Sequence, residues 1–396
     1  MSQPLAVDET EPAGHKSVAV LGSTGSVGVS TLEVARQLAD RIRISGLSAH
    51  RNLDLLVQQA KEFRPEWIVA TNEKCAKRFR WPALPGTDRL VGHVELDRLV
   101  ARDTTHTVVA AIVGTAGLRS TLAALQAGKT VALANKETLV AAGPLVMELA
   151  SRSGSVILPV DSEHNAIFQC MQSGRRTEVR RVCLTASGGP FRSFSREAME
   201  QVTAEQALAH PTWDMGQKIS IDSATMMNKA LEIIEARWLF DLSPDQIEVV
   251  VHPQSIVHSL VEFADGSVIA QLSPPDMKLP IQYALTWPDR VDGPAQRMMF
   301  QDAMSLDFCP PEIGRFPAIA LGLQVARQAG TSGAVLNAAN EAAVAAFLNR
   351  KIGFCDIVRA CQDVLEQHAF EPHPTIEQIL EMDRWAREET GKWILA

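Results

Sequence analysis

Short apolar runs alternate with amphipathic segments along the first part of the chain. Strands are predicted at 17–21, 42–48, 67–70, 107–113, 130–134 and 156–160. Helices are predicted from Gly28 through Ala39, at 53–63 and 118–127, and near 144–151. Buried strands that alternate with helices are typical of a doubly wound parallel sheet. The pattern therefore predicts an α/β fold with a Rossmann-like domain at 16–161.

The pattern changes after Gly174. Strands at 179–186, 246–251, 257–263 and 267–272, the last two joined by an Asp-Gly turn, surround a helix at 226–240. They predict an α+β domain at 162–286. A Pro- and Gly-rich connector at 287–316 leads to a C-terminal helical domain at 317–396, with helices at 318–328, 334–350, 357–368 and 376–389.

Composition narrows the classes of function. A chain of 396 residues, 46% of them hydrophobic, can bury a large core, and its net charge of −8 argues against nucleic acid or an anionic membrane as a partner. The six cysteines form no C-x-x-C pair, so buried reduced thiols are favoured over disulfides or a zinc site. Residues 1–15 are expected to form a disordered tail, and a cytoplasmic location is expected because no apolar run reaches the length of a membrane span.

A glycine turn joins the first strand to the first helix. Gly22, Gly25 and Gly28 are spaced G-x-x-G-x-x-G, which allows a backbone to approach a pyrophosphate at the helix start. This spacing departs from the common G-x-G-x-x-G, which weakens the match. After the second strand, Arg51 stands where an NAD-binding domain usually has an acidic residue, so NADP(H) is favoured. A solvated basic turn is the alternative.

Charged residues follow two later strands. Lys136 comes after the strand at 130–134, and Asp161 and Glu163 come after the strand at 156–160. Ligands bind beyond the carboxyl ends of strands in open α/β sheets, and paired carboxylates there suit Mg²⁺ or Mn²⁺. Acidic residues that favour a helix dipole are the alternative.

The stretch 210–236 has the densest set of reactive side chains. It begins like a loop that closes over a ligand and then enters the predicted helix through Asp222, Ser223 and Thr225, an Asx/Ser-type start. With Asn228 and Lys229, this start forms a plausible phosphate site, and Glu232 shares a helix face with Asn228. An ordinary capped helix is the alternative.

Two further features left alternatives open. Ser187-Gly188-Gly189 follows a predicted strand, where it is an anion-binding loop or a simple turn. His252 and His258 flank another turn, and structural histidines are favoured there over ligand contacts. Asn337, Asn340 and Glu341 are polar residues on an otherwise apolar helix and are expected to line an interface.

Six ordered motifs carry a resemblance to a known family. They are LGSTGSVG at 21–28, ALANKETLV at 132–140, PVDSEHNAIFQ at 159–169, ASGGPF at 186–191, the stretch 210–236, and HPQSIVHS at 252–259. The sequence resembles the 1-deoxy-D-xylulose 5-phosphate reductoisomerase family from Lys16 onward. This resemblance implies NADPH-dependent rearrangement and reduction of 1-deoxyxylulose 5-phosphate to 2-C-methylerythritol 4-phosphate with Mg²⁺, Mn²⁺ or Co²⁺, in a homodimer.

The resemblance also implies roles for individual residues. Asp161, Glu163 and Glu232 match metal ligands, and Glu163 and Glu232 are also expected to contact the substrate. Lys136 and Ser162 match contacts to the sugar oxygens. With Lys136, the three carboxylates form the expected catalytic set. The phosphate contacts match Ser187, Ser223, Asn228 and Lys229, with His210 beside them. The cofactor contacts match Thr24, Gly25, Ser26, Val27, His50, Arg51, Asn52, Asn135, Glu137 and Gly216. Trp213 and Met215 match a mobile flap at 207–217.

The chain departs from the family pattern at His50-Arg51, where many relatives have Gly followed by Lys, so the role of His50 is in doubt. Two other functions fit part of the sequence. A reductase of another phosphorylated carbonyl compound shares the dinucleotide domain but has no evident need for three converging carboxylates. A non-catalytic NADP(H)-binding regulator predicts nucleotide binding without metal-dependent turnover.

Overall fold

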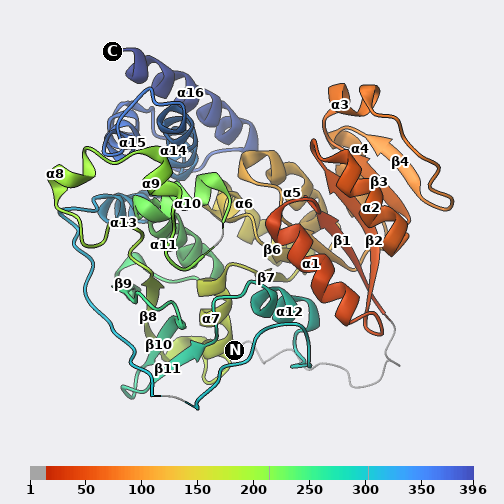
Figure 1. Cartoon of the computed structure of the whole chain (residues 1–396), viewed down its shortest axis with the longest axis horizontal. Coiled ribbons are helices and arrows are strands. Elements are labelled where there is room, and N and C mark those ends of the chain that lie inside the picture. Colours follow the sequence, from red (N-terminus) through yellow and green to blue (C-terminus); the bar gives the residue numbers. More distant parts are fainter. Residues whose placement is uncertain (1–14, 214, 302) are drawn as a thin grey trace.

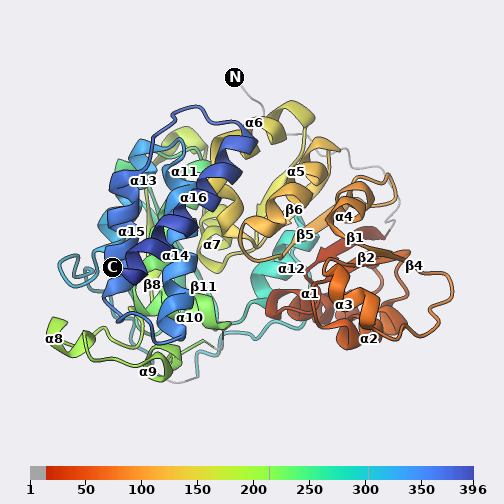
Figure 2. The same cartoon turned by 90° about the horizontal axis from the view of Figure 1, so that it is seen from above.

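The computed structural model describes residues 15–213, 215–301 and 303–396, so the predicted tail at 1–15 lies, except for His15, outside the described residues. Figures 1 and 2 show the sheet of parallel strands on one side of the molecule, and the smaller sheet and the C-terminal helices together on the other side. None of the helices in the described ranges is long and apolar enough to cross a membrane.

The first sheet has seven strands in the order β4-β3-β2-β1-β5-β6-β7, and all of its pairs are parallel. The strands are β1 (Lys16–Leu21), β2 (Ile42–Ala49), β3 (Trp67–Ala70), β4 (Asp88–Val91), β5 (Thr107–Ala110), β6 (Thr130–Leu133) and β7 (Ile157–Pro159). Most of them are buried along their length because helices cover both faces, which explains their continuous apolar runs. The predicted fold class is confirmed, although the short strand β4 was missed.

Helices α1 (Ser26–Gln37), α2 (Leu53–Phe63), α3 (Glu73–Arg78), α4 (His93–Val100), α5 (Leu118–Gln126) and α6 (Lys136–Ser153) connect these strands, with a short 3-10 helix, η1 (Gly114–Gly117), before α5. The prediction that the last helix starts near Pro144 was wrong, because α6 begins at Lys136. The Asn135 side chain accepts a hydrogen bond from the Thr138 amide and caps α6, and a local kink at Ala142 accommodates Pro144.

The second sheet has the order β11-β10-β8-β9. Its strands are β8 (Val179–Ala186), β9 (Ile247–Val251), β10 (Val257–Phe263) and β11 (Val268–Leu272). β8 and β9 are parallel, and the other pairs are antiparallel. Gly266 has a φ of +85° in the β10–β11 turn, as the predicted hairpin requires. Helix α7 (Ser162–Met171) contributes Ile167 and Cys170 to the hydrophobic core beside this sheet.

Four helices lie between β8 and β9 in the sequence: α8 (Arg196–Met199), α9 (Ala204–Leu208), α10 (Gln217–Ala224) and α11 (Met227–Leu239). Short 3-10 helices directly precede the two strands, η2 (Arg176–Glu178) before β8 and η3 (Pro244–Gln246) before β9. The predicted Asx/Ser start of the central helix was wrong. Asp222 and Ser223 belong to the separate helix α10, and Thr225 ends it. α11 begins after Met226, which has a φ of +61° and provides no side-chain cap.

Helix α12 (Lys278–Thr286) returns to the first sheet, where Ile281, Ala284 and Leu285 join its hydrophobic core. The connector that follows forms one isolated bridge, between Val251 and Cys309, within the described residues. The C-terminal helices are α13 (Ala318–Gln328), α14 (Ser332–Leu348), α15 (Asp356–Gln367) and α16 (Ile376–Leu395). α14 is buried among its neighbours, which accounts for its alanine-rich sequence.

Candidate active site

The glycine turn after β1 makes a close backbone approach. Gly22 has a φ of +83°, and a Cβ atom there would lie 2.7 Å from the Ala111 carbonyl oxygen. A Cβ at Gly28 would collide with the Gly22 carbonyl, so α1 packs directly on the turn. Gly25 caps α1 without a side-chain hydrogen bond, which leaves the amides of its first turn free for an anion. Thr24, Gly25, Ser26 and Val27 lie at this turn, and its shape fits a dinucleotide pyrophosphate.

The residues after β2 present one exposed cation beside this turn. Asn52 caps α2 by accepting a hydrogen bond from the Leu55 amide at 3.2 Å. His50 Nδ1 lies 3.0 Å from the Thr71 hydroxyl, and burial lowers the pKa of His50. Arg51 is exposed. Arg51 is therefore the group in this turn that suits a 2′-phosphate.

Two other predicted cofactor contacts hold neighbouring segments. Asn135 is buried, and its side-chain amide donates to the Ile112 carbonyl and, at 2.9 Å, to the Gly114 carbonyl, which ties the loop after β5 to α6. Glu137 is also buried and accepts a hydrogen bond from Lys218 at 3.1 Å. Gly216 directly precedes α10.

A cavity of about 380 Å³ lies between the two sheets. The predicted residues that line it are Ser26, Val27, Lys136, Asp161, Ser162, Glu163, Ser187, His210, Trp213, Met215, Gly216, Ser223, Asn228, Lys229 and Glu232. The predicted residues outside its lining are Thr24, Gly25, His50, Arg51, Asn52, Asn135 and Glu137. The cavity thus joins the edge of the nucleotide turn to the polar residues of the second domain.

Three carboxylates converge at the floor of the cavity. Asp161 follows β7, Glu163 lies in the first turn of α7, and Glu232 lies on α11. Each offers one oxygen, and these three oxygens lie within 4.8 Å of one another. An all-oxygen set of this kind fits Mg²⁺ or Mn²⁺.

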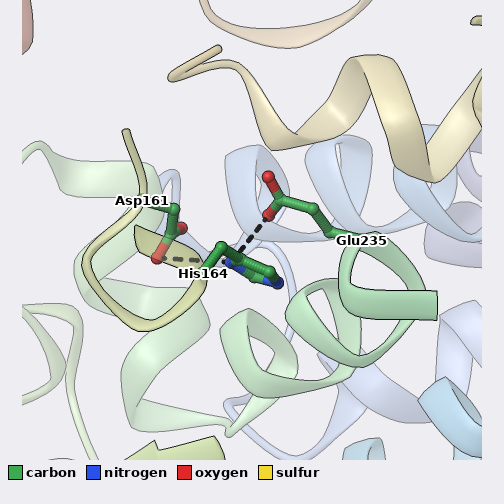
Figure 3. A group of neighbouring side chains, drawn as sticks. All are labelled: Asp161, His164 and Glu235. Atoms are coloured by element: carbon green, nitrogen blue, oxygen red, sulfur yellow. Dashed lines mark ion pairs between the residues drawn. The ribbon is translucent and has the colours of Figure 1, made fainter. Parts of the chain in front are cut away.

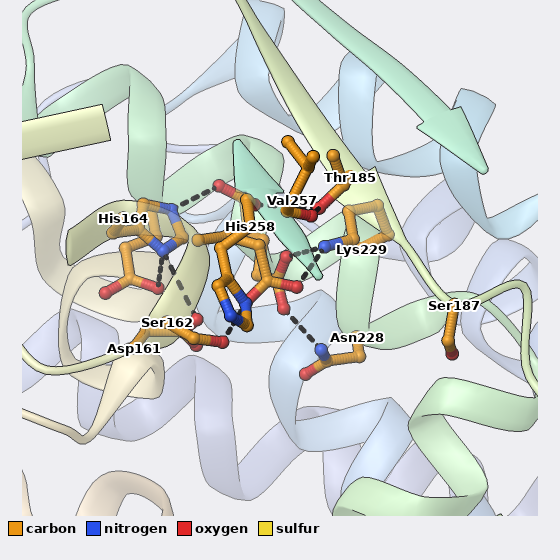
Figure 4. Close-up of polar contacts among 12 residues, drawn as sticks. Asp161, Ser162, His164, Thr185, Ser187, Asn228, Lys229, Val257 and His258 are labelled. Atoms are coloured by element: carbon orange, nitrogen blue, oxygen red, sulfur yellow. Dashed lines mark hydrogen bonds and ion pairs between the residues drawn. The ribbon is translucent and has the colours of Figure 1, made fainter. Parts of the chain in front are cut away.

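Two lysine ammonium groups hold these carboxylates together. Lys136 Nζ pairs with Asp161 and lies 3.2 Å from a Glu232 oxygen. Lys229 Nζ lies 2.8 Å from Glu163 and also pairs with Glu232. The Asn228 amide donates to Glu232, as their shared helix face predicted (Figure 4). The Asn228 oxygen accepts a hydrogen bond from Lys136 at 2.9 Å. The predicted phosphate ligand Lys229 is thus paired with the carboxylates in this structure.

Burial and charge set the protonation of this cluster. Burial alone would raise the pKa of Asp161, but Lys136 and His164 hold it well below its ordinary value. Burial, reinforced by the neighbouring Glu163, raises the pKa of Glu232 despite its two lysine partners. Burial alone would lower the pKa of Lys136, but Asp161 and Glu232 raise it well above its ordinary value. Lys136 therefore stays charged, and a further cation stabilises the ionised form of Glu232.

Asp161 also belongs to a second cluster, with His164 and Glu235 (Figure 3). His164 Nε2 lies 3.0 Å from the Glu232 carbonyl oxygen and must donate to it, while Nδ1 lies 3.3 Å from Glu235. Burial opposes a charge on His164, but Glu235 and Asp161 outweigh it and raise its pKa to about 9. Metal ligands must be deprotonated, so the three carboxylates fit a metal better than this cluster does.

Hydroxyl groups line the opposite side of the cavity. His210 Nδ1 accepts hydrogen bonds from the amides of Thr212 and Trp213, at 3.2 and 2.9 Å. The proton of this neutral ring is therefore on Nε2, which donates to the Ser187 hydroxyl at 3.0 Å. Gly188 and Gly189 have φ values of +81° and +66°, so Ser187 starts a tight glycine loop as predicted. Ser187 and Ser223 offer hydroxyls to an anion here.

The segment predicted as a flap covers the cavity. Trp213 and Met215 line it, and the Trp213 ring lies 6.2 Å from the His258 ring in an edge-on arrangement. Residues 209–213, 215 and 216 form no helix or strand. Two contacts join the described part of this segment to the cavity wall, from His210 to Ser187 and from Trp213 to His258.

Several lining residues were not predicted as site residues. They are Ser30, Ala134, Thr185, Ala186, Gly188, Thr212, Ile219, Met226, Ser255, Val257, His258, Pro275, Asp276 and Met277. His258 lay within the motif at 252–259 and was considered mainly structural, whereas the apolar lining residues gave no chemical signal. His252 is structural, because its Nδ1 donates to the Asp307 carbonyl at 2.8 Å and its Nε2 accepts from the Ile256 amide at 3.1 Å.

Comparison with known proteins agrees with this geometry. Models of 1-deoxy-D-xylulose 5-phosphate reductoisomerase match residues 18–143, and models of its C-terminal domains match 157–240 and 272–389. Proteins named 1-deoxy-D-xylulose 5-phosphate reductoisomerase from Chlorobium chlorochromatii and Rhodopirellula baltica are 50% and 48% identical to the chain. The first alignment covers 96% of this chain and 100% of the relative, and the second covers 93% of each.

Solved structures are similar over the same length. The enzyme of that name from Zymomonas mobilis, in complex with NADPH, superimposes with a TM-score of 0.89 at 42% identity, over 96% of this chain and 99% of the other. A DOX-P reductoisomerase in complex with NADPH, fosmidomycin and magnesium superimposes with a TM-score of 0.88 at 44% identity, over 96% and 98%.

Proposed function

Because the chain belongs to the 1-deoxy-D-xylulose 5-phosphate reductoisomerase family, we propose that it converts 1-deoxy-D-xylulose 5-phosphate to 2-C-methyl-D-erythritol 4-phosphate with NADPH and a divalent metal ion. This reaction belongs to non-mevalonate isoprenoid biosynthesis. The observation that carries the proposal is the convergence of Asp161, Glu163 and Glu232 in a cavity that opens onto the glycine turn. A reductase of another phosphorylated carbonyl compound, or a nucleotide-binding regulator, has no evident need for these three converging carboxylates.

Different residues are proposed to bind the metal, to stabilise charge on the substrate and to bind the sugar. Asp161, Glu163 and Glu232 would hold Mg²⁺, Mn²⁺ or Co²⁺, which supplies a Lewis acid for the substrate oxygens, and NADPH supplies the hydride. Lys136 places its ammonium group beside the same carboxylates, where it stabilises negative charge that develops on the substrate. Ser162 lies at the start of α7 in the same cavity and offers its hydroxyl to the sugar.

The far side of the cavity holds the phosphate. Ser187, Ser223 and the Nε2 proton of His210 line it. Asn228 and Lys229, which contact the carboxylates in this structure, would join them if a bound cation took over those carboxylates. His210 belongs both to the phosphate site and to the segment 207–217, which was predicted as a flap and is called the lid from here on. Phosphate binding therefore stabilises the lid over the substrate. Trp213 and Met215 then exclude water from the intermediate.

The reaction itself provides the test of this function. The purified protein is expected to consume NADPH when 1-deoxyxylulose 5-phosphate and Mn²⁺ are present, and a chelator should stop the reaction. Loss of reduced-nicotinamide absorbance measures the rate, and mass spectrometry identifies the product. If no substrate-dependent loss of absorbance occurs with Mn²⁺, the proposed function is wrong.

Arg51 is proposed to select NADPH over NADH. Arg51→Gln removes the guanidinium that would pair with the 2′-phosphate, so the KM for NADPH should rise about tenfold, as expected for the loss of one charged hydrogen bond. The KM for NADH should stay within about twofold. Arg43→Gln is the matched control, because Arg43 is also exposed and lies on β2, the strand that Arg51 follows. An equal rise for both cofactors would contradict this role.

We propose that the enzyme is a homodimer. The connector exposes Met299 and Phe300, which are 64% and 74% exposed, and β11 is an edge strand with Val268 53% exposed. An apolar edge strand is a surface that native proteins usually cover. The connector would provide apolar contacts to a second copy of the protein, and β11 would provide an unpaired strand edge.

Phe300→Asp should weaken the dimer. Light scattering is expected to give twice the chain mass of 43.1 kDa for the wild type and a concentration-dependent mixture with monomer for the variant. Val94→Asp, at an 80% exposed apolar residue on α4, controls for the added charge. A wild-type protein that is monomeric at micromolar concentration would overturn the proposal.

We also propose the domain boundaries of the chain and its cellular compartment. Residues 16–161 bind NADPH, 162–286 supply catalysis and dimer contacts with the lid at 207–217, 287–316 connect, and 317–396 form a helical domain. The enzyme is placed in the cytoplasm, and its six unpaired cysteines suit that reducing compartment.

A further inference from the structure

A series of polar contacts runs from the C-terminal helices to helix α6 of the nucleotide-binding domain. Asn340 on α14 donates its side-chain amide to an Asp222 oxygen at 2.8 Å. The other Asp222 oxygen lies 2.7 Å from Lys218 Nζ, and Lys218 Nζ lies 3.1 Å from a Glu137 oxygen. Three segments far apart in the sequence, α14, α10 and α6, are thus connected by consecutive contacts.

Three of the four residues in this series of contacts are buried, and Lys218 is partly exposed. Asn340 and Asp222 are 0% and 1% exposed, and Glu137 is 7% exposed. A buried charge that loses its partner retains its full desolvation cost, so each contact depends on the next. Burial alone would lower the pKa of Lys218, but Asp222 and Glu137 raise it, which keeps Lys218 charged between them.

Helix α10, which these contacts hold, connects the lid to the phosphate side of the cavity. α10 begins at Gln217, the last residue of the lid, and Ser223 near its other end lines the phosphate side of the cavity. Glu137 is adjacent to Lys136, whose ammonium group contacts the carboxylate cluster. The contacts therefore fix the end of the lid relative to both the phosphate site and the start of α6.

The C-terminal helices also reach the nucleotide-binding domain by a second route. Arg387 on α16 pairs with Glu341 at 2.8 Å and with Asp383. The Thr115 hydroxyl, in the loop after β5, donates to Asp383 at 3.3 Å. The α14–α16 pair is thus attached to the nucleotide-binding domain independently of α10 and provides a fixed base for Asn340.

We propose that Asn340 is a positioning residue for the lid: through Asp222 and Lys218 it anchors α10, so that the C-terminal helices set the position to which the lid closes. The inference rests on the proposed function for its catalytic consequence. It also assigns a purpose to the C-terminal domain, which contributes none of the predicted substrate, metal or cofactor contacts.

Asn340→Leu tests the proposal because leucine has a similar size but cannot donate to Asp222. The variant should lower kcat about tenfold and raise the KM for 1-deoxyxylulose 5-phosphate severalfold, whereas the Kd for NADPH stays within about twofold. Hydrogen–deuterium exchange gives the specific readout. In the wild type, NADPH, Mn²⁺ and the substrate analogue fosmidomycin should protect the peptide that spans 207–217, and the variant should lose most of this protection.

Asn337→Leu is the matched control. Asn337 is also buried on α14, but its amide donates to Glu341 within the same helix, at 3.1 Å. This variant should keep the lid protection and the wild-type kcat. The double variant Asp222→Asn with Asn340→Asp exchanges the donor and the acceptor and should recover part of the lost protection. If Asn340→Leu does not fold, Lys218→Met breaks the next contact at a partly exposed position and takes its place.

The outcomes separate the two proposals. If Asn340→Leu lowers the Tm but leaves kcat, KM and lid protection unchanged, Asn340 is only a packing residue and the inference is wrong. If the wild type does not turn over 1-deoxyxylulose 5-phosphate, the proposed function fails first. Hydrogen–deuterium exchange at 217–224 in the ligand-free protein still tests whether Asn340 anchors α10. Exchange there should be slower in the wild type than in Asn340→Leu.

Discussion

Glu232→Gln is expected to lower kcat by roughly a thousandfold or more, equivalent to about 4 kcal/mol. Glu232 is 1% exposed and belongs to the oxygen cluster with Asp161 and Glu163. The glutamine keeps the shape but loses the negative charge that a divalent cation requires. NADPH should still bind, because the glycine turn lies on a different element. Steady-state kinetics with Mn²⁺ and fluorescence titration with NADPH measure the two effects.

Glu235→Gln is the matched control for this variant. Glu235 lies on the same helix, is equally buried, and contacts His164 at 3.3 Å. Since Glu235 is outside the three-carboxylate cluster, its variant should retain Mn²⁺ binding and lose activity by about tenfold or less. If Glu235→Gln abolishes Mn²⁺ binding while Glu232→Gln keeps it, the metal lies in the cluster of Asp161, His164 and Glu235 instead.

Lys136→Met is expected to lower kcat by roughly a hundredfold to a thousandfold, the range for removing one group that stabilises developing charge. The Lys136 ammonium is buried, pairs with Asp161 and lies 3.2 Å from Glu232. Its removal also eliminates a cation that competes with the metal, so Mn²⁺ affinity should stay the same or increase. This pattern is opposite to that of Glu232→Gln, which should lose both activity and metal affinity.

Titration of Mn²⁺ by electron paramagnetic resonance, combined with kinetics at saturating metal, distinguishes the two roles of Lys136. Lys129→Met, at another buried lysine close to the first sheet, controls for the loss of a buried charge. Recovery of Lys136→Met activity at high Mn²⁺ would show that Lys136 acts only by holding the metal ligands, and would contradict its role in stabilising charge on the substrate.

The alternation of strands and helices in the sequence was enough to predict that Lys136 and Asp161 lie close together. Lys136 and Asp161 follow β6 and β7, which are neighbours in the sheet, so their convergence followed from the parallel arrangement. Glu232 comes from a different domain. Its face was predicted from the spacing to Asn228, but its position beside Asp161 followed only from the family resemblance, because periodicity cannot place one domain against another.

The two errors in helix boundaries have different physical causes. Asp222, Ser223 and Thr225 have the composition of a helix cap, yet Asp222 is buried between Lys218 and Asn340, the latter more than a hundred residues away. That contact stabilises α10, and no local pattern reveals it. The second error has a local cause. The helix was predicted near 144–151, whereas the cap at Asn135 and the kink at Ala142 allow α6 to begin at Lys136, beside the active site.

The location of the metal tests the central claim most directly. A crystal grown with Mn²⁺ and measured at the manganese absorption edge should show a single strong anomalous peak per chain, bound by oxygens of Asp161, Glu163 and Glu232. Lys229 should have turned from Glu163 toward the phosphate side of the cavity. The absence of a peak among these three carboxylates at saturating Mn²⁺, or a peak bound by His164 and Glu235, would contradict the account.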